Sequence, residues 1–260
     1  GRSSIAYAIR KNTDWEINLI SANFMTSFSA PAVFPCRWWK EGISNTRRGR
    51  GETCAGAACC ARVEMAQNLM KSKPKTRGPL LGAHMSIAGG IGNALLSGKQ
   101  VACDAIQIFT RSSRQWAAKP FTKEEIEEFC ANRKQTGITT VIAHDSYLLN
   151  LGSPDGALKK RSIEAFIDEL ERCELLGVQN LVAHPGAHVG TGELTGIKTI
   201  AKSLDQVHKA CPGYRTKVTL EITAGQGSNI GYRFEQIGQI IDATRAGDRL
   251  RVCFDTAHAF

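Results

Sequence analysis

Short apolar runs alternate with amphipathic helical patterns along residues 78–260, and five of the six runs end on an imidazole or a carboxylate. The runs that predict strands are residues 80–84, 104–109, 139–144, 179–184, 216–221 and 250–255. Apolar spacing of i, i+3 and i+4 predicts helices over residues 90–100, 122–136, 156–176, 194–210 and 231–245. Each strand-to-strand repeat has about 25–40 residues, the length of a right-handed β-α-β unit. The alternation therefore predicts a parallel sheet covered by helices.

The polar strand ends decide between the two common folds of this kind. They are His84, His144, His184, Glu221 and Asp255. A doubly wound sheet binds its ligand at one switch point, whereas a barrel gathers side chains from many strand ends at one mouth. The pattern predicts an incomplete TIM (β/α)8 barrel with about six of its eight β/α units. We expect the last two strands to be absent, because the sequence stops at Phe260.

Residues 1–77 differ in composition from the rest of the chain. They hold thirteen Lys and Arg against five Asp and Glu, and so most of the net charge of +9. Without a sustained strand or helix period, they predict a largely disordered basic extension before a partial barrel at 78–260. Basic clusters at 45–50 and 71–77 fit a nuclear signal or a phosphate-binding tail, and the Ser-rich stretch 17–39 fits a transit peptide. A plain solvated linker explains the clusters equally well.

Cysteine usage and hydropathy limit the expected compartment. Single, widely spaced cysteines within the predicted elements are typical of free thiols in a reducing environment. No apolar run approaches the ~20 residues that a membrane-spanning helix needs. We expect an intracellular protein without a membrane partner, in the nucleus or mitochondrion if eukaryotic and in the cytoplasm otherwise.

Three histidines and two carboxylates are candidate metal ligands. They are His144, His184, Glu221, Asp255 and His258. A lone histidine at a strand end is more often structural than a ligand, but donors converging from several fixed strand ends are what a metal centre requires. Histidine and carboxylate without cysteine favour Zn or Mn over Ca.

Two further histidines are expected outside this centre. Pro185 and Gly186 prevent a helix between His184 and His188, so His188 is expected in a loop. His208 lies among Lys and Asp on an amphipathic helix and is expected to face solvent.

Two loops at the predicted mouth carry side chains suited to a nucleic acid. One offers Arg114 and Gln115, and the other offers Tyr147 and Leu148. A cation for phosphate and an apolar wedge for the base stack are what insertion into a duplex requires. The alternative is that Leu148 and Trp116 only seal the packing of these loops, and the residues alone do not choose between the two.

Six motifs in order resemble those of the endonuclease IV family of apurinic/apyrimidinic endonucleases. They are Gly82-Ala-His84-Met-Ser86 with Gly89-Gly90, Phe109-Thr110 with Arg114-Gln115-Trp116, His144-Asp-Ser-Tyr147-Leu-Leu-Asn150-Leu-Gly152, His184-Pro-Gly186-Ala-His188, Glu221-Ile-Thr-Ala-Gly225-Gln-Gly227-Ser-Asn229 and Cys253-Phe-Asp255-Thr-Ala-His258-Ala-Phe260. Together they cover residues 78–260.

The resemblance implies a monomeric TIM barrel with three zinc ions per intact protein, some replaceable by Mn²⁺. Such an enzyme cuts double-stranded DNA 5′ of an abasic site by zinc-activated hydroxide and leaves a 3′-hydroxyl. His144 and His184 are similar to the ligands of one zinc, and Glu221 to the catalytic bridge to a second. Asp255 is similar to a ligand of the second zinc, and His258 to a ligand of the third.

The resemblance also implies that four residues enter the DNA base stack at the abasic nucleotide. They are Arg114, Gln115, Tyr147 and Leu148. The chain departs from the family at Ile222, where Asn is usual, and it lacks the family's later His, Asp and Glu ligands. We therefore expect the fragment by itself to be poorly active.

Two other functions remain open on the sequence. A metal-dependent sugar isomerase-like barrel shares the plan of ligands at strand ends, but it has no use for Arg114 and Tyr147 at the mouth. A non-catalytic fragment that binds damaged DNA would use those loops and the basic extension without cutting.

Overall fold

Six consecutive parallel strands make up most of a closed eight-stranded barrel in a computed structural model that describes residues 5–11, 14–22 and 79–259. They are β3 (Leu80–His84), β4 (Ala105–Phe109), β5 (Thr140–His144), β6 (Asn180–Ala183), β8 (Lys217–Glu221) and β10 (Leu250–Asp255). Each lies within one residue of its predicted bounds. Each pairs in parallel with the next, so the strands follow one another around a barrel in chain order.

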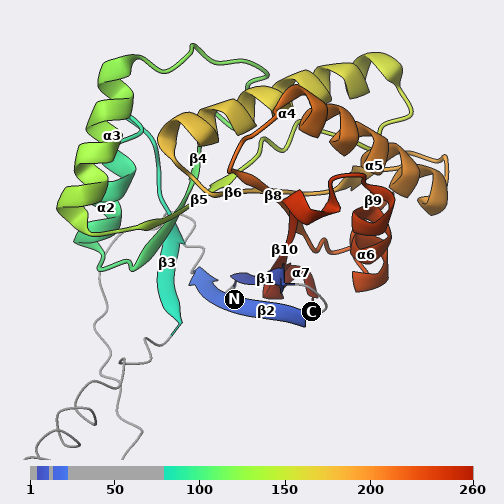
Figure 1. Cartoon of the computed structure of the whole chain (residues 1–260), viewed down its shortest axis with the longest axis horizontal. Coiled ribbons are helices and arrows are strands. Elements are labelled where there is room, and N and C mark those ends of the chain that lie inside the picture. The colour runs from blue at the N-terminus through green and yellow to red at the C-terminus, as the bar shows by residue number, and fades with distance from the viewer. Residues whose placement is uncertain (1–4, 12–13, 23–78, 260) are drawn as a thin grey trace, which may run out of the picture. The chain divides into compact units, whose positions relative to one another are not determined.

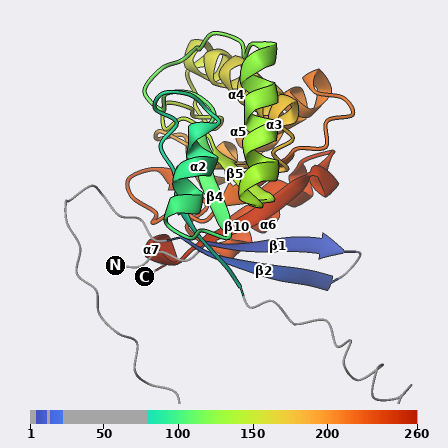
Figure 2. The same cartoon turned by 90° about the vertical axis from the view of Figure 1, so that its left-hand side faces the viewer.

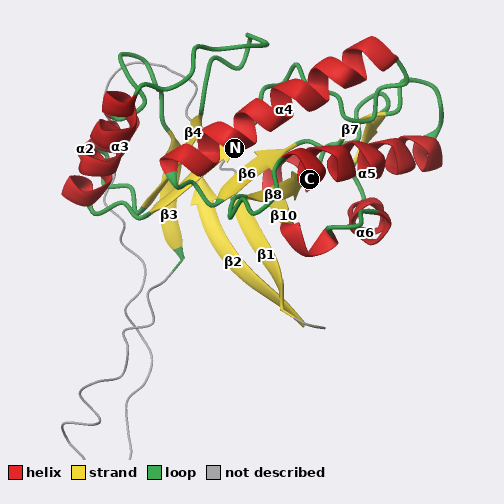
Figure 3. Cartoon of the chain, turned by 45° about the horizontal axis from the view of Figure 1, so that its top comes forward, coloured by secondary structure: helices red, strands yellow, loops and turns green. Residues whose placement is uncertain are grey.

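Five helices connect these strands and lie along their outer side (Figures 1 and 3). They are α2 (Asn93–Gln100), α3 (Lys123–Thr136), α4 (Gly156–Leu176), α5 (Glu193–Ala210) and α6 (Phe234–Ala243). All five were predicted, and their bounds differ from the predicted ones by at most three residues. Four short elements were not predicted: β7 (Gly186–Ala187), β9 (Asn229–Ile230), the 3-10 turn η1 (Gly247–Arg249) and α7 (Thr256–Ala259). The fold is that of a TIM barrel.

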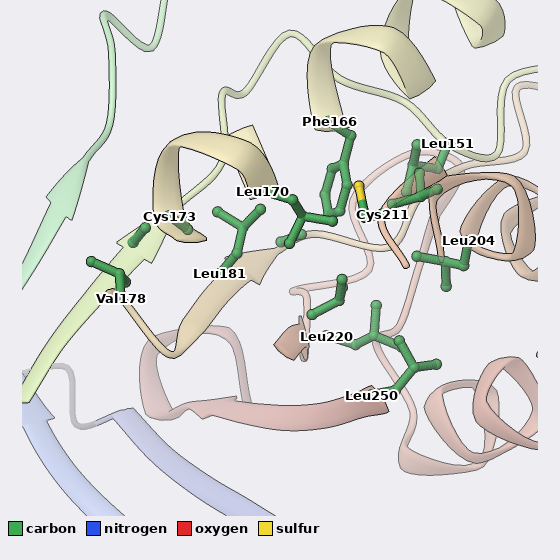
Figure 4. Packing of buried hydrophobic residues seen from close by; sticks show 14 of the residues in the cluster. Leu151, Phe166, Leu170, Cys173, Val178, Leu181, Leu204, Cys211, Leu220 and Leu250 are labelled. Atoms are coloured by element: carbon green, nitrogen blue, oxygen red, sulfur yellow. The ribbon is translucent and has the colours of Figure 1, made fainter. Parts of the chain in front are cut away.

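The outer core lies between the helices and the sheet. On α4 the predicted apolar face is buried, with Phe166, Leu170 and Cys173 packed in one cluster with Leu181 of β6 (Figure 4). Full burial of a Leu or Phe side chain contributes about 1.5–3 kcal/mol. This packing holds α4 against the sheet and fixes the loops at its two ends.

Local signals set where the helices begin and end. The Thr122 hydroxyl accepts a hydrogen bond from the Glu125 amide, and the Glu125 carboxylate accepts one from the Thr122 amide, so α3 begins with a capping box. The Asp155 carboxylate caps α4 in a similar way. Both helices end at glycines in the left-handed region, Gly137 at φ 73° and Gly177 at φ 65°.

The inner face of the sheet places the candidate ligands on one side. Ala105, Ile142, Val182 and Cys253 form a buried cluster separate from the outer core. Side chains alternate across a strand, so a residue two positions further on faces the same way. His144 and Asp255 stand in that relation to Ile142 and Cys253, and His184, just past the end of β6, stands in it to Val182. The interior of the barrel therefore ends in these side chains at the carboxyl ends of the strands.

A hairpin that was not predicted pairs with both edges of this sheet, and Figure 2 shows its two strands side by side. Its strands are β1 (Ile5–Lys11), antiparallel to β10, and β2 (Asp14–Ala22), parallel to β3. The prediction of a largely disordered extension at residues 1–77 did not include these two strands. The physical reason is that edge strands carry unpaired N–H and C=O groups that a further strand can satisfy. Residues 23–78 lie outside the described residues, so a domain boundary near residue 77 stays a prediction.

Two expectations about composition can be compared with the described residues. No helix among them is long and apolar enough to cross a membrane. The cysteines described are free thiols: Cys103, Cys130, Cys173, Cys211 and Cys253. Three of them are buried as core residues, whereas Cys130 is exposed.

Candidate metal centre

One carboxylate, that of Glu221, lies between three histidines. Its Oε2 atom is 3.2 Å from Nε2 of His144 and 3.8 Å from Nε2 of His184. Its Oε1 atom is 3.2 Å from Nδ1 of His258. The side chain of Glu221 is 4% exposed, so these contacts are made largely out of water. Each oxygen of the carboxylate thus faces a different set of imidazoles.

The five predicted ligands form two groups that share this residue. His144, His184 and Glu221 make one group, and Glu221, Asp255 and His258 make the other; within each, one ligand atom per residue lies within 4.8 Å of the others. Four of the residues stand at or just after strand ends, and His258 lies on α7, directly after β10. The parallel register brings these ends to the same level, with Glu221 opposite Cys253. The sheet therefore supplies fixed supports for all but one of the ligands.

The orientation of the His144 ring calls for a cation beside Glu221. Its Nδ1 is 2.8 Å from the backbone oxygen of Asp145, which can only accept, so Nδ1 carries the hydrogen. Nε2 of a neutral ring then presents a lone pair to a carboxylate oxygen. Either a proton or a metal ion must lie between the two. In the metal-free chain a proton does so: burial lowers the pKa of His144, but the Glu221 carboxylate outweighs burial and raises it to about 9.

The remaining groups are held in different charge states. Burial lowers the pKa of His184 to about 4, so its ring is neutral and free to act as a ligand. Burial opposes ionisation of Glu221, but hydrogen bonds with His144 and His258 outweigh it and keep the pKa of Glu221 well below its usual range. Burial raises the pKa of Asp255, and the charge of Glu221 adds to this effect.

The residues present fit a zinc ion. Zn–N and Zn–O bonds of about 2.0–2.2 Å in a tetrahedral site place neighbouring ligand atoms roughly 3.3 Å apart. The contacts of Glu221 with His144 and His184 lie near that value. The Nδ1–H of His144, bound to a backbone carbonyl, is the usual outer support of a metal-bound imidazole. Donors, spacing and support therefore agree with a metal centre.

Aromatic rings enclose the centre on one side. Tyr147 has its ring 5.4 Å from that of His144 and 6.1 Å from that of His184. Phe109 lies 4.5 Å from His84 and 5.8 Å from His144. His84 itself belongs to neither group of possible ligands among the described residues, and its Nδ1 faces Oε1 of Gln107 at 3.3 Å. These rings place apolar surface next to the ligands.

The predicted DNA-contacting residues lie on two loops that touch each other. Arg114 and Gln115 are exposed on the loop after β4, and Tyr147 is 60% exposed on the loop after β5. The Ser146 hydroxyl donates to the backbone oxygen of Ser113 at 2.7 Å and joins the two loops. Leu148 is half-buried in the second loop. The four predicted residues thus share the rim of the barrel mouth.

A buried ion pair that the sequence did not reveal holds the first of these loops. Arg111 is 3% exposed and Glu169 of α4 is 1% exposed; Nε of Arg111 donates to Oε1 of Glu169 at 2.8 Å. The same guanidinium donates to the backbone oxygens of Gln115 and Trp116. The ion pair therefore ties the main chain of the loop to the helix.

A second arginine of α4 adds to this support. Arg172 donates to the backbone oxygen of Thr110 through two nitrogens, at 3.1 and 2.8 Å. It also donates to the backbone oxygen of Lys119 at 2.9 Å, further along the same loop. Helix α4 therefore fixes the backbone that presents Arg114 and Gln115 at the rim.

Nothing in the local pattern distinguishes these supporting residues. In the sequence, Glu169 and Arg172 fit the polar face of an amphipathic helix. They are buried only because the loop after β4 packs against α4. The Trp116 ring lies 4.3 Å beneath the Arg161 guanidinium, so part of its role is packing, as the alternative interpretation held.

Two expectations about other histidines had different outcomes. His188 lies in a loop after β7, as predicted, and accepts a hydrogen bond from the Gly192 amide through Nδ1. The expectation that His208 faces solvent is wrong, because it is 6% exposed and Arg249 donates a hydrogen bond to its backbone oxygen.

Ile222, where the family usually has Asn, is buried, and its backbone oxygen faces Nδ1 of His258 at 2.8 Å. At this position the contact to the centre is made by the main chain.

A family model described as "Xylose isomerase-like TIM barrel" matches residues 98–260. The chain belongs to this family. Strand order and ligands at the carboxyl ends agree with that assignment.

Several curated relatives of the chain are named as endonucleases. The chain is 47% identical over 182 residues to "Probable endonuclease 4" of Chloroflexus aggregans and 46% identical over 181 residues to that of Citrifermentans bemidjiense, in each case covering 70% of this chain and 64% of the relative. The crystal structure of endonuclease IV from Thermus thermophilus matches with a TM-score of 0.62 and 33% identity, covering 70% of this chain and 64% of that one. The resemblance predicted from the six motifs is confirmed. The chain spans slightly less than two thirds of the length of these relatives.

Proposed function

We propose that the whole protein is a DNA repair endonuclease that cleaves double-stranded DNA on the 5′ side of an abasic site and leaves a 3′-hydroxyl. The observation that carries the proposal is the shared carboxylate of Glu221, placed between two groups of possible metal ligands at a barrel mouth. The 47% identity to a protein named probable endonuclease 4 supports the substrate. Because the chain spans 64% of that relative, we expect the 260 residues alone to cleave slowly.

The chain's own residues would prepare the centre for this reaction. His144, His184 and Glu221 would hold one zinc, and Glu221 with Asp255 and His258 would supply donors for further ones. Zinc at such a centre offsets charge on a phosphodiester and lowers the pKa of water. Glu221 keeps its charge inside the barrel because His144 and His258 hydrogen-bond to it. Asp145 orients His144 through its backbone oxygen, so the ring nitrogen that faces Glu221 stays in place.

The rim loops would bind and open the duplex. Arg114 is an exposed cation available to backbone phosphate, and Gln115 is an exposed amide beside it. Tyr147 and Leu148 offer the apolar surface that fills a gap in a base stack. The tyrosine ring also borders His144 and His184, so a base stack held there would lie next to the centre.

A duplex with one tetrahydrofuran abasic analogue and a 5′ label tests the proposal. The 260-residue chain, supplied with zinc and in excess over DNA, is expected to produce a single labelled fragment that a DNA polymerase extends, because the 3′ end is a hydroxyl. Glu221→Gln is expected to lower the cleavage rate by on the order of 100-fold or more, since the amide would lack the negative charge and the second oxygen that metal ions at this centre would need. Arg114→Ala should weaken duplex binding roughly tenfold at low salt without changing zinc content.

The same assay separates the alternatives. Incision that is equal in the wild type and Glu221→Gln would overturn the proposed centre. Binding of the abasic duplex that survives chelation and never leads to incision would instead favour a non-catalytic damage-binding protein. Conversion of a ketose by zinc-loaded protein that does not bind DNA would favour the sugar isomerase-like alternative.

The same relatives bear on the cellular location of the protein. The relatives named above are bacterial, which supports a cytoplasmic enzyme and gives no support to a nuclear or mitochondrial one. We propose that the protein acts as a monomer on double-stranded DNA.

A further inference from the structure

A second site lies at the end of the barrel opposite the metal centre. A cavity of about 480 Å³ opens among the amino-terminal ends of β6, β8 and β10 and the carboxyl-terminal turns of α3 and α4. The charged residues of its lining are Arg133, Glu174, Arg215, Lys217 and Arg251, and its polar residues are Gln179, Asn180 and Thr216. Lys217 stands four residues before Glu221 on the same strand, a separation of roughly 13 Å along an extended chain. The cavity is therefore distinct from the site proposed for DNA cleavage.

The single carboxylate in the lining is already engaged. Oε2 of Glu174 accepts hydrogen bonds from the amides of Arg215 and Thr216 at 2.9 and 3.0 Å and from the Thr216 hydroxyl at 3.0 Å. Its Oε1 lies 3.3 Å from Nε of Arg215. Glu174 and Arg215 thus neutralise each other at the rim. The three other cations have no carboxylate within ion-pair distance among residues 79–259, although the charge of Asp248 acts on Lys217 from further away.

Those three cations make no ion pair in the described part of the chain. Arg251 donates to the backbone oxygens of Asp248 and Leu250 at 2.8 and 2.7 Å, and Arg133 donates to that of Gly177 at 3.1 Å. These contacts hold the two guanidinium groups in place but leave their charge in full. Lys217 is half-buried on β8, and its pKa is lowered by burial and by the neighbouring Arg251. The chain thus holds like charges together around a cavity.

We propose that this cavity binds the phosphate group of a small anionic ligand. Its volume lies within the range of about 300–1,000 Å³ found for small-molecule sites. Two arginines and one lysine exceed the charge of a single carboxylate, whereas a phosphate monoester carries about −1.5 to −2 near neutral pH and several acceptor oxygens. Asn180, at the start of β6, adds an amide to the same wall. The inference goes beyond the proposed endonuclease function and does not depend on it.

Thermal unfolding in inorganic phosphate tests the site, with potassium chloride at equal ionic strength as the reference. The wild type is expected to show a saturable rise in Tm with phosphate, because a ligand that binds only the folded state stabilises it. The double variant Lys217→Met with Arg251→Met should need at least roughly tenfold more phosphate for the same rise. In chloride alone its Tm should equal or exceed that of the wild type, since removing repelling charges relieves the fold. If these cations had a purely structural role, the Tm of the double variant in chloride would be lower than that of the wild type.

Three comparisons complete the test. Lys202→Met removes an exposed lysine outside the cavity and should leave the phosphate response unchanged. Glu221→Gln should also retain it, which separates this site from phosphate bound at the metal centre. A short single-stranded DNA at equal phosphate concentration should not reproduce the rise if the source is a small ligand, and equal action by the DNA would show that the cavity takes backbone phosphates instead.

Two results would overturn the proposal. One is a phosphate response that never saturates or is the same in the wild type and the double variant. The other is a lower Tm of the double variant in chloride combined with an unchanged phosphate response. Should the double variant not fold, Lys217→Gln alone, followed by broadening of the phosphorus-31 resonance of added phosphate, gives the same comparison.

Discussion

Glu221 illustrates how one side chain can serve two groups of ligands. A carboxylate has two equivalent oxygens, and here each faces a different set of histidines within 3.8 Å. The sequence indicated an acid at a strand end, but it did not indicate that His258 approaches the opposite oxygen from α7. That detail depends on the turn after β10, where the Asp255 carboxylate accepts a hydrogen bond from the Ala257 amide at 2.7 Å.

The buried His208 is expected to make the free energy of unfolding depend on pH. Burial, with a smaller effect of Arg249, lowers its folded-state pKa from 6.5 to about 4. Between these values the unfolded chain binds more protons than the folded one, so stability falls as the pH drops from about 6.5 to 4. The loss attributable to this residue approaches about 3 kcal/mol below pH 4.

Urea unfolding of the wild type and His208→Leu at pH 7.5 and 4.5 measures this effect. Both ring nitrogens lack a hydrogen-bond partner among the described residues, so an apolar side chain of similar size is tolerated there. The variant should lose less stability between the two pH values than the wild type. Equal losses would contradict a neutral, buried histidine.

At the scale of elements, the six parallel strands and the five helices between them could be predicted because their signals are local, whereas β7, β9, η1 and α7 were too short to give such a signal. Alternating apolar runs, the Thr122–Glu125 capping box and the terminal Gly137 each act over a few residues. The layer that supports the rim loops could not be predicted. Glu169 looks like any acid on an exposed helix face until the loop after β4 packs over it.

Because Glu169 of α4 holds the loop that carries Arg114, loss of its charge is predicted to loosen that loop. Glu169→Gln removes the charge partner of the buried Arg111, and breaking such a pair costs about 3–5 kcal/mol. The loop should loosen, so trypsin should cleave after Arg114 faster than in the wild type. Mass spectrometry of the early fragments measures the rate.

A neighbouring acid provides the control for this prediction. Asp168 lies 3.9 Å from Nε of Arg111 but is 39% exposed, and Asp168→Asn should change the cleavage rate and the stability much less. Similar effects of the two substitutions would show that burial of the pair is not what holds the loop.

At the scale of the molecule, the amino-terminal hairpin changes what the sheet exposes. It pairs with β10 on one side and β3 on the other, which leaves no free edge in the described barrel. It could not be predicted, because a pairing between residues as far apart as Ile5 and Asp255 has no local signal. Without the hairpin, the edge strands β3 and β10 would carry unpaired backbone groups, and this becomes evident only once the sheet is formed.

Removal of residues 1–22 tests this arrangement. The deletion should uncover both edges and promote pairing between chains, so light scattering after size exclusion should show dimers or larger species at concentrations where the full chain is monomeric. A monomeric deletion variant of unchanged Tm would contradict the pairing.

Zinc content tests the central claim most directly. Purified, monomeric protein is dialysed against zinc-free buffer and assayed by mass spectrometry for metal per chain, beside Glu221→Ala and Glu171→Ala, an exposed acid on α4. We predict at least about one tightly held zinc in the wild type and in Glu171→Ala, and its loss in Glu221→Ala. A folded chain without zinc, or zinc that remains in Glu221→Ala, would contradict the metal centre on which the proposed function rests.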